Sequence, residues 1–178
     1  MSSTNGASSM PDRAKLLVHL RRLSNLFEHA FRNGPDGTLE GKFAVEHPTF
    51  VHHGCGFYLA GCLAYLEGED GAYSWDMAGA QSSDFDTFVT NYPAPPKQSY
   101  AARGINKASM NALAQIRNAV VHNGDDLAKN TKPQSVHMVK AANLPGTSLQ
   151  GSVVKLDAPF LDYVRLATLA VRNYHGEF

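Results

Sequence analysis

The chain has 178 residues and equal numbers of basic and acidic side chains, 16 of each, so its formal net charge at pH 7 is zero. A protein that binds nucleic acid over a broad surface usually has a basic excess, so any RNA contact here should be a local site. Hydrophobic residues make up 43% and charged residues 18%, the balance of a globular domain that buries its own core. Two cysteines are too few for a disulfide scaffold, which predicts a reducing, cytoplasmic setting.

The N-terminal end predicts neither a signal peptide nor a membrane anchor. Residues 1–9 are small and polar, without a charged region followed by an apolar one, and we expect a disordered tail there. The longest apolar run, residues 57–66, is too short to cross a bilayer, so we expect no membrane partner. Residues 10–178 should then form one domain of ordinary size.

Two long helices are predicted in the first half of the chain. The first covers residues 12–32, where Asp12 can cap the helix and apolar side chains recur every three or four positions. A loop rich in glycine and charge follows over residues 36–48, and the second helix covers residues 50–66. Apolar side chains on nearly every side of this second helix predict a central, buried position.

A short helix and a third long helix are predicted in the middle of the chain. The short helix covers residues 84–91, and the prolines of residues 91–98 predict an extended or turned stretch after it. The long helix covers residues 106–122, with Asn106 as its cap.

The C-terminal part predicts a small hairpin and a last helix. β-like runs at residues 135–139 and 152–156 could pair with each other. The last helix covers residues 158–174 and follows Asp157, which can cap it. The predicted fold class is therefore all-α: an antiparallel bundle of about four main helices, with irregular insertions and a small β-hairpin near residues 135–156.

The stretch IRNAVVHNGDD, residues 116–126, ends the third long helix and holds the side chains most suited to chemistry. Arg117 projects into the apolar arc of this helix, and a buried guanidinium without a partner is very costly. A carboxylate, carbonyl groups, a partner subunit or a bound phosphate should therefore lie against it. Asn118 and His122 share a different strip of the helix, and Gly124 can terminate it just beyond His122. The apolar arc consists of Met110, Leu113, Ile116, Val120 and Val121.

Arg117 and Asn118, three variable residues, His122 and then Asn123-Gly124 resemble the signature of the HEPN superfamily (higher eukaryotes and prokaryotes nucleotide-binding domains). That signature lies near the end of an inner helix of a bundle, with long helices before and after it. The resemblance implies a metal-independent endoribonuclease without cofactors, and a homodimer in which two motifs meet at one composite site. It also implies RNA as the substrate, a role as a toxin or in defence against invading nucleic acid, and an antitoxin protein as a partner.

The resemblance implies a role for each catalytic candidate. His122 would take the proton from a ribose 2′-OH or give one to the leaving 5′-oxygen. Arg117 would hold the scissile phosphate, and Asn118 would orient the phosphate or the imidazole. The products would be a 2′,3′-cyclic phosphate end and a 5′-hydroxyl end. DNA should not be cut, because the nucleophile is the 2′-OH.

Further residues are candidates for substrate contacts. Asn123 adjoins the motif, and Lys129, Lys132 and Lys140 after it form the best local basic cluster for a phosphate backbone. Arg172 lies in a C-terminal echo of the motif, RNYHG, whose Arg-to-His spacing is too short for the family pattern. The competing interpretations are an ordinary solvated face for the lysines and a favourable interaction with the helix dipole for Arg172.

A non-catalytic interpretation of the motif also stays open. In it the chain is a helical module that binds a protein partner or a nucleotide. His122 then belongs to the helix end, and Arg117 pairs with an acid such as Glu28, Asp84 or Asp86.

The second helix contains side chains of the types that bind metals, but their pattern does not favour a metal site. These side chains are His52, His53, Cys55 and Cys62, and His47 lies just before the helix. Zinc sites usually show paired ligands separated by a defined loop, which a single helix does not provide. Buried cysteines that act as small apolar residues are the simpler interpretation, and the adjacent histidines are candidates for extra phosphate contacts.

Two acids, Asp125 and Asp126, directly follow the motif. They would repel a phosphate unless they point away from it. They either form a simple turn, orient His122, or pair with Arg117 of a second subunit.

Overall fold

The computed structural model describes residues 42–67, 79–94 and 98–175, together with a few positions between residues 18 and 26. The predicted N-terminal tail lies outside the described residues. Most of the first predicted helix lies outside them as well, and its few described positions are helical.

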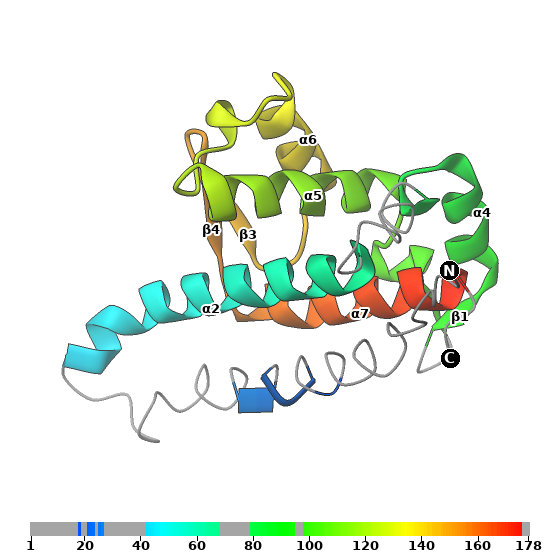
Figure 1. Ribbon diagram of the computed structural model, residues 1–178, viewed down its shortest axis with the longest axis horizontal. Coiled ribbons are helices and arrows are strands. Elements are labelled where there is room, and N and C mark those ends of the chain that lie inside the picture. Colours follow the sequence, from blue (N-terminus) through cyan, green and yellow to red (C-terminus); the bar gives the residue numbers. More distant parts are fainter. Residues whose placement is uncertain are drawn as a thin grey trace, which may run out of the picture.

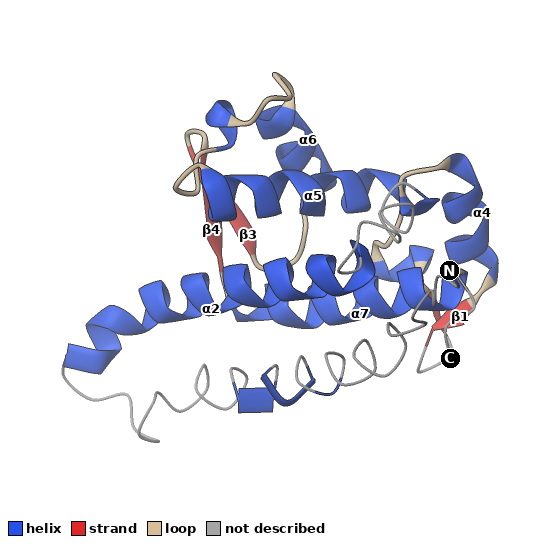
Figure 2. Cartoon of the chain, viewed as in Figure 1, coloured by secondary structure: helices blue, strands red, loops and turns tan. Residues whose placement is uncertain are grey.

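Helices dominate the described residues, so the predicted all-α class is confirmed (Figure 2). The α-helices are α2 (Lys42–Glu67), α4 (Ser83–Asn91), α5 (Lys107–His122), α6 (Ser135–Ala142) and α7 (Ala158–Tyr174). The other elements are the 3₁₀ helices η1 (Ala101–Arg103) and η2 (Leu127–Lys129), and two antiparallel hairpins, β1 (Pro93–Ala94) with β2 (Gln98–Ser99) and β3 (Thr147–Gln150) with β4 (Val153–Leu156). Among the described helices, none combines the length and apolar character needed to span a membrane.

Helix α2 occupies the centre of the bundle, as its apolar residues on nearly every side predict. It lies beside α7 along much of its length, and α5 runs in the opposite direction to both (Figure 1). The side chains that α2 buries recur at helical spacing: Val51, Cys55, Tyr58, Leu59, Cys62, Leu63 and Leu66. Helix α7 contributes the matching face: Phe160, Val164, Ala167 and Val171. These two faces form the middle of the hydrophobic core.

Helix α5 carries the motif residues Arg117, Asn118 and His122, and local hydrogen bonds fix where the helix begins and ends. At its start, Asn106 Oδ1 accepts a hydrogen bond from Ser109 N at 2.9 Å, and Asn106 N donates to Ser109 Oγ at 3.0 Å. This reciprocal pair satisfies two backbone N–H groups that would otherwise lack partners. At its end, Gly124 has a φ of 59°, which turns the chain so that Asp125 N donates to Ala119 O at 3.0 Å.

The predicted loop over residues 36–48 is wrong in its second half, because α2 begins at Lys42. The segment between Gly41 and Pro48 contains lysine, alanine and glutamate, which all have high helix propensity. The glycine and charge of the surrounding sequence obscured this helical segment. Pro48 lies inside the helix rather than in its first turn, a position that sequence rules disfavour.

The predicted strand at residues 135–139 is also wrong, because this run forms the start of α6. Val139 is buried in the core, and Ser135 Oγ donates to Gln115 Oε1 at 2.8 Å. These tertiary contacts stabilise a helix in a sequence that also suits a strand. The observed hairpin pairs β3 with β4. Of the two predicted strands, only the second, residues 152–156, is therefore confirmed.

The β3–β4 hairpin is attached to the turn that follows α5. Leu127 N donates to Ser152 O at 3.0 Å, and Val154 N donates to Asp125 O at 2.9 Å. These bonds hold the hairpin beside the C-terminal end of α5, and therefore beside the motif.

Replacing Gly146 with alanine should destabilise the fold more than the same change at Gly151. Both glycines have positive φ, 69° and 65°, so both variants pay about 1–2 kcal/mol for the backbone conformation. A Cβ at position 146 would meet Phe160 N and Asp157 O at the start of α7, whereas nothing lies within 4 Å at position 151. The backbone shift that Gly146→Ala forces should cost about 1–3 kcal/mol more. Urea unfolding of both variants measures this difference, and equal losses of stability would contradict the close packing at Gly146.

Candidate functional site

The motif residues lie at the C-terminal end of α5, where they differ in exposure. His122 is exposed in the last turn, whereas Arg117 and Asn118 are half-buried. Arg117 has at least one interaction partner within the chain, as the cost of burying its charge requires. Val121, which was expected in the buried arc, is 49% exposed, so the buried face of α5 is narrower at this end than its sequence indicates.

Buried amides hold the end of α5 in place. Asn123 Nδ2 donates to Asn130 Oδ1 at 2.7 Å, and Asn130 Nδ2 donates to Gln115 O at 2.9 Å. Gln115 Oε1 also accepts a hydrogen bond from Ser135 Oγ at 2.8 Å. Asn130, Gln115 and Ser135 are all buried, so the network gains strength from its low-dielectric surroundings. Asn123, the predicted substrate contact, thus uses its amide donor within the chain and orients the tip of the helix.

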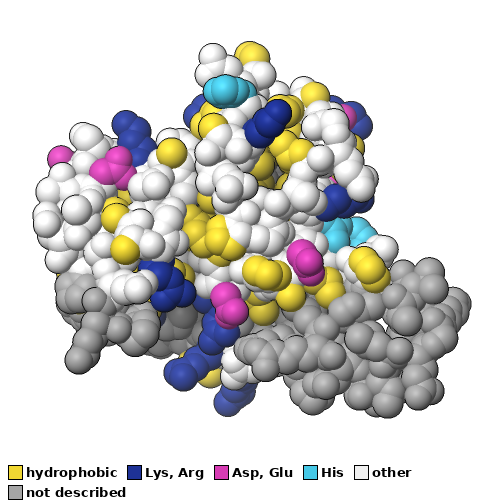
Figure 3. Space-filling view, turned by 180° about the vertical axis from the view of Figure 1, so that it is seen from behind, with side chains coloured by type: hydrophobic (Ala, Val, Ile, Leu, Met, Phe, Trp, Pro, Cys, Tyr) yellow, Lys and Arg dark blue, Asp and Glu magenta, His cyan; other side chains and the backbone are white. Residues whose placement is uncertain are grey.

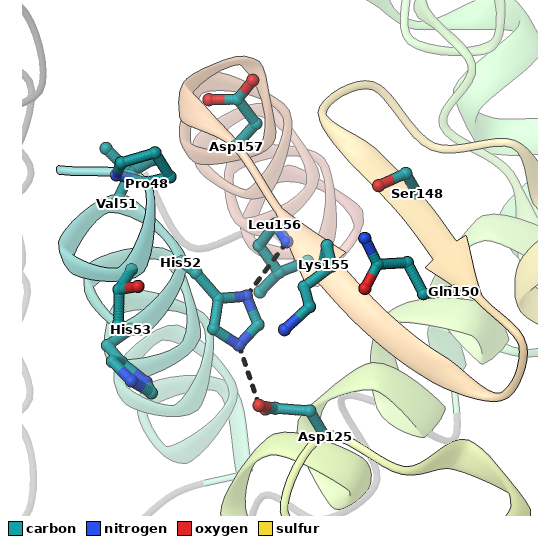
Figure 4. A pocket seen from close by; sticks show the side chains of 11 residues that line it. Pro48, Val51, His52, His53, Asp125, Ser148, Gln150, Lys155, Leu156 and Asp157 are labelled. Carbon is teal, nitrogen blue, oxygen red and sulfur yellow. Dashed lines mark hydrogen bonds and ion pairs between the residues drawn. The ribbon is translucent and has the colours of Figure 1, made fainter. Parts of the chain in front are cut away.

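His52 joins three segments that are distant in the sequence. Its ring is buried on α2, and its Nδ1 accepts a hydrogen bond from Leu156 N at 3.0 Å (Figure 4). Since Nδ1 accepts, the proton of the neutral ring is on Nε2, which lies 3.0 Å from Asp125 Oδ2. This approach is close but does not follow the N–H direction, so it is an electrostatic contact rather than a well-aligned hydrogen bond.

The same geometry limits what His52 can do chemically. A general base needs a ring nitrogen free to accept a proton from the reacting group. The acceptor nitrogen of His52 is occupied by a backbone amide, and the protonated nitrogen faces a carboxylate. His52 is therefore a positioning residue, and a Ser–His–Asp arrangement with the nearby Ser148 is excluded.

A cleft of about 590 Å³ opens beside the His52–Asp125 contact. One wall is the N-terminal half of α2, including His53, and the other is the β3–β4 hairpin with Gln150 and Lys155 (Figure 4). The residues that line it are Pro48, Thr49, Val51, His52, His53, Asp125, Ser148, Gln150, Lys155, Leu156 and Asp157. The predicted hairpin did not include the β3 side of this wall, because residues 135–139 were expected to pair with residues 152–156 and instead form the start of α6.

The two acids after the motif have separate partners. Asp125 faces His52, whereas Asp126 Oδ1 accepts a hydrogen bond from Ala128 N at 3.0 Å at the start of η2. Hydrogen bonds from Ser152 and from the Ala128 N–H lower the pKa of Asp126. These contacts indicate that the two acids stabilise the turn after α5, and they do not support a role for either acid in orienting His122.

The predicted basic contacts lie on different elements of the fold. Lys129, Lys132 and Lys140 are exposed, and Lys129 Nζ lies 3.8 Å from Asp126 Oδ2. Arg172 lies near the C-terminal end of α7, at the opposite end of the bundle from the tip of α5 (Figure 1). Its guanidinium carbon is 5.9 Å from the centre of the Tyr65 ring, a cation–π contact within the fold.

Two of the acids considered for Arg117 lie elsewhere. Asp86 Oδ1 accepts a hydrogen bond from Lys107 N at 2.6 Å, at the start of α5. Lys107 is ten residues before Arg117, or about 15 Å along the helix. Asp84 is exposed in the first turn of α4, and Glu28 lies outside the described residues.

Cys55 and Cys62 are buried in the α2 core and are poor candidates for chemistry. Burial raises the pKa of the Cys55 thiol to about 12 and that of Cys62 to about 11. The thiolate is the form that binds metals and attacks electrophiles, and burial disfavours it. Among the described residues, no three His, Cys, Asp or Glu side chains lie together in a group able to hold a metal ion.

Comparison with known proteins adds no assignment. No protein-family model matches the chain, and neither a curated protein nor a solved structure matches it at a significant level.

Replacing His52 with alanine should lower stability, whereas replacing its neighbour His53 should have little effect. His52→Ala leaves the buried Leu156 N–H without an acceptor, which costs about 1–3 kcal/mol. His53 is exposed, and its loss should change stability by less than about 0.5 kcal/mol. Thermal unfolding followed by circular dichroism compares the two variants. A His52→Ala melting temperature equal to that of His53→Ala would show that the buried contact is not stabilising.

Proposed function

We propose that this protein is a metal-independent endoribonuclease of HEPN type, which cuts RNA through attack of a ribose 2′-OH on the adjacent phosphate. The observation that carries the proposal is the exposed His122 at the end of α5, with Arg117 and Asn118 half-buried on the same helix. An imidazole can both accept and donate a proton near neutral pH, which suits the two proton transfers of this reaction.

The angle between the motif side chains argues for a site shared by two chains. Arg117 and His122 are five residues apart, which separates them by about 140° around the helix and about 7.5 Å along it. Their heads therefore diverge on one chain. Two α5 tips that face each other would bring Arg117 of one copy to His122 of the other, so that both can contact one phosphate.

Exposed apolar side chains near the motif support a second copy of this chain as the partner. Phe57 is 72% exposed and Val121 is 49% exposed. Each directly follows a residue of the tight α2–α5 contact, where a Cβ on Gly56 would lie only 2.6 Å from Val120 Cγ1. The two exposed side chains thus flank the crossing of α2 and α5, close to the motif, where their burial in a dimer would be favourable.

The charge distribution fits a local RNA site rather than a broad basic surface. On the face shown in Figure 3, Lys and Arg side chains are spread out and interspersed with acidic ones. The proposed enzyme would work in the cytoplasm as a toxin or a defence factor. Because it would attack cellular RNA, an antitoxin protein that restrains it belongs to the proposal.

A non-catalytic helical module is the second candidate, and the cleft beside the motif favours it. A cleft of about 590 Å³ with polar side chains is large enough for a small ligand such as a nucleotide. In that case His122 and Arg117 contribute to the helix end and to packing, and the protein binds without cutting.

An RNA cleavage assay in EDTA tests the proposed chemistry. The purified protein should cut single-stranded RNA and leave 2′,3′-cyclic phosphate ends, while DNA of the same sequence stays intact. His122→Ala should lower the rate by about 10²–10⁴-fold, the usual contribution of a general acid or base. His137→Ala, a change to an exposed histidine on α6, is the matched control and should keep full activity. Absence of cleavage for every RNA tried, or unchanged cleavage by His122→Ala, favours the non-catalytic module.

Light scattering coupled to size-exclusion chromatography tests the shared site. The wild-type protein should have the mass of a dimer, and Phe57→Glu should have the mass of a monomer because the charge would be buried at the interface. Ala141→Glu, which adds the same charge to an exposed position on α6, should remain dimeric. RNA cleavage should fall together with dimerisation. A monomeric wild-type enzyme, or a fully active monomeric Phe57→Glu variant, would rule out the shared site.

A further inference from the structure

The cleft between α2 and the β3–β4 hairpin is lined by polar and charged side chains that are not part of the motif. His122, Arg117 and Asn118 do not line it. The connection between the two is Asp125, which lines the cleft and lies three residues after His122. A ligand in the cleft would therefore lie next to the proposed cutting site, without touching the residues that cut.

The carboxylate of Asp125 is a hydrogen-bond acceptor with unused capacity. Its side chain is 19% exposed, and in the part of the chain that the structure describes its only partner is His52. A carboxylate offers about four acceptor sites, and His52 uses one oxygen. A half-desolvated carboxylate of this kind favours a ligand with N–H donors, since water reaches it poorly.

The opposite wall supplies a cation and an amide. Lys155 is exposed on β4, directly across the hairpin from Ser148, and no ion pair holds it among the described residues. Gln150 is exposed two residues further along β3 and can both donate and accept hydrogen bonds. The exposed ring of His53 faces outward from α2 at the edge of the cleft (Figure 4). Aromatic rings in such positions stack on unpaired bases.

We propose that this cleft binds one nucleotide whose base carries an exocyclic amino group, namely cytosine, guanine or adenine. The amino group donates to Asp125, Gln150 contacts the edge of the base, and Lys155 neutralises the phosphate. Uracil has a carbonyl oxygen where cytosine has the amino group, and hypoxanthine has a hydrogen where guanine has it. Both bases therefore lose the donor that faces Asp125 and keep only a ring N–H at a different position. That this nucleotide belongs to the RNA being cut rests on the proposed function, and the cleft would then give the enzyme a sequence preference beside the cut.

NMR titration of the full-length chain with 5′-mononucleotides tests the inference without any cleavage. CMP should bind roughly tenfold or more tightly than UMP, and GMP roughly tenfold or more tightly than IMP, because one hydrogen bond to a charged group is lost in each pair. Shift changes should fall on residues of α2 and the hairpin that line the cleft. Equal binding of CMP and UMP, no binding of any nucleotide, or shifts confined to another part of the molecule would overturn the inference.

Variants of Asp125, Lys155 and Gln150 measure what each side chain contributes to nucleotide binding. Asp125→Asn should remove the preference for CMP over UMP. Asparagine tolerates the positive φ of 67° at this position, so this variant should keep the turn. Lys155→Gln should lower the affinity for CMP, UMP, GMP and IMP several-fold without changing the order of their affinities. The control is Lys107→Gln, a change to an exposed lysine at the start of α5, which should leave all four affinities unchanged. If Asp125→Asn does not fold, Gln150→Ala must reduce binding for the inference to stand. An unchanged preference in a folded Asp125→Asn variant overturns it.

The two proposals fail in different ways. Nucleotide binding in the cleft without any RNA cleavage sinks the endoribonuclease and leaves the cleft as a binding site. Cleavage that depends on His122, together with no nucleotide binding in the cleft, sinks only the inference about the cleft.

Discussion

The arrangement of the end of the bundle that holds the candidate site depends on one buried imidazole, that of His52. His52 accepts a hydrogen bond from the Leu156 backbone through Nδ1 and faces Asp125 through Nε2. These contacts hold α2, the strand that leads into α7, and the turn after α5 in one place. The interaction is strong because the ring and the Leu156 amide are both buried, where a backbone N–H without an acceptor is costly.

A second set of contacts makes the tip of α5 rigid from the other side. The amide of Asn123 is fixed by Asn130, which in turn is held by the backbone and side chain of Gln115. His122 therefore projects from a helix end that is followed by two engaged residues, Asn123 and Asp125. The proposed proton-transfer role of His122 would gain from such support, because the position of the imidazole relative to the reacting atoms would be set before the substrate arrives.

The tip of α5 lies between the two proposed sites. On one side, Arg117 and His122 diverge around the helix, so that a site using both requires a second chain. On the other side, the side chain of Asp125 lines a cleft that lies within a single chain. Cleavage and base recognition would thus depend on different surfaces, one formed by association and one present in each subunit. With this separation, the cleft would bind its proposed nucleotide even where no second chain is present.

Much of the helical framework could be predicted, because its signals are local. The bounds of α5 and α7 follow from Asn106 and Asp157, which cap their helices, and from apolar residues at helical spacing. The start of α2 was placed too late, since Pro48 is a strong local signal against a helix and yet lies inside one. Residues 135–139 alternate in a way that suits a strand, and only the contacts of Ser135 and Val139 with the rest of the fold make them helical.

By itself, the sequence determined the all-α class, the helix that carries the motif and the position of His122 at its end. These follow from interactions between residues one or two helical turns apart, which leave a pattern along the chain. Only the tertiary structure decided the cleft, the partners of His52 and Asp125, and the separation of Arg172 from the motif. His52 and Leu156 are 104 positions apart, and a contact between residues so distant leaves no local pattern. It arises only when α2, the turn after α5 and the hairpin pack against one another.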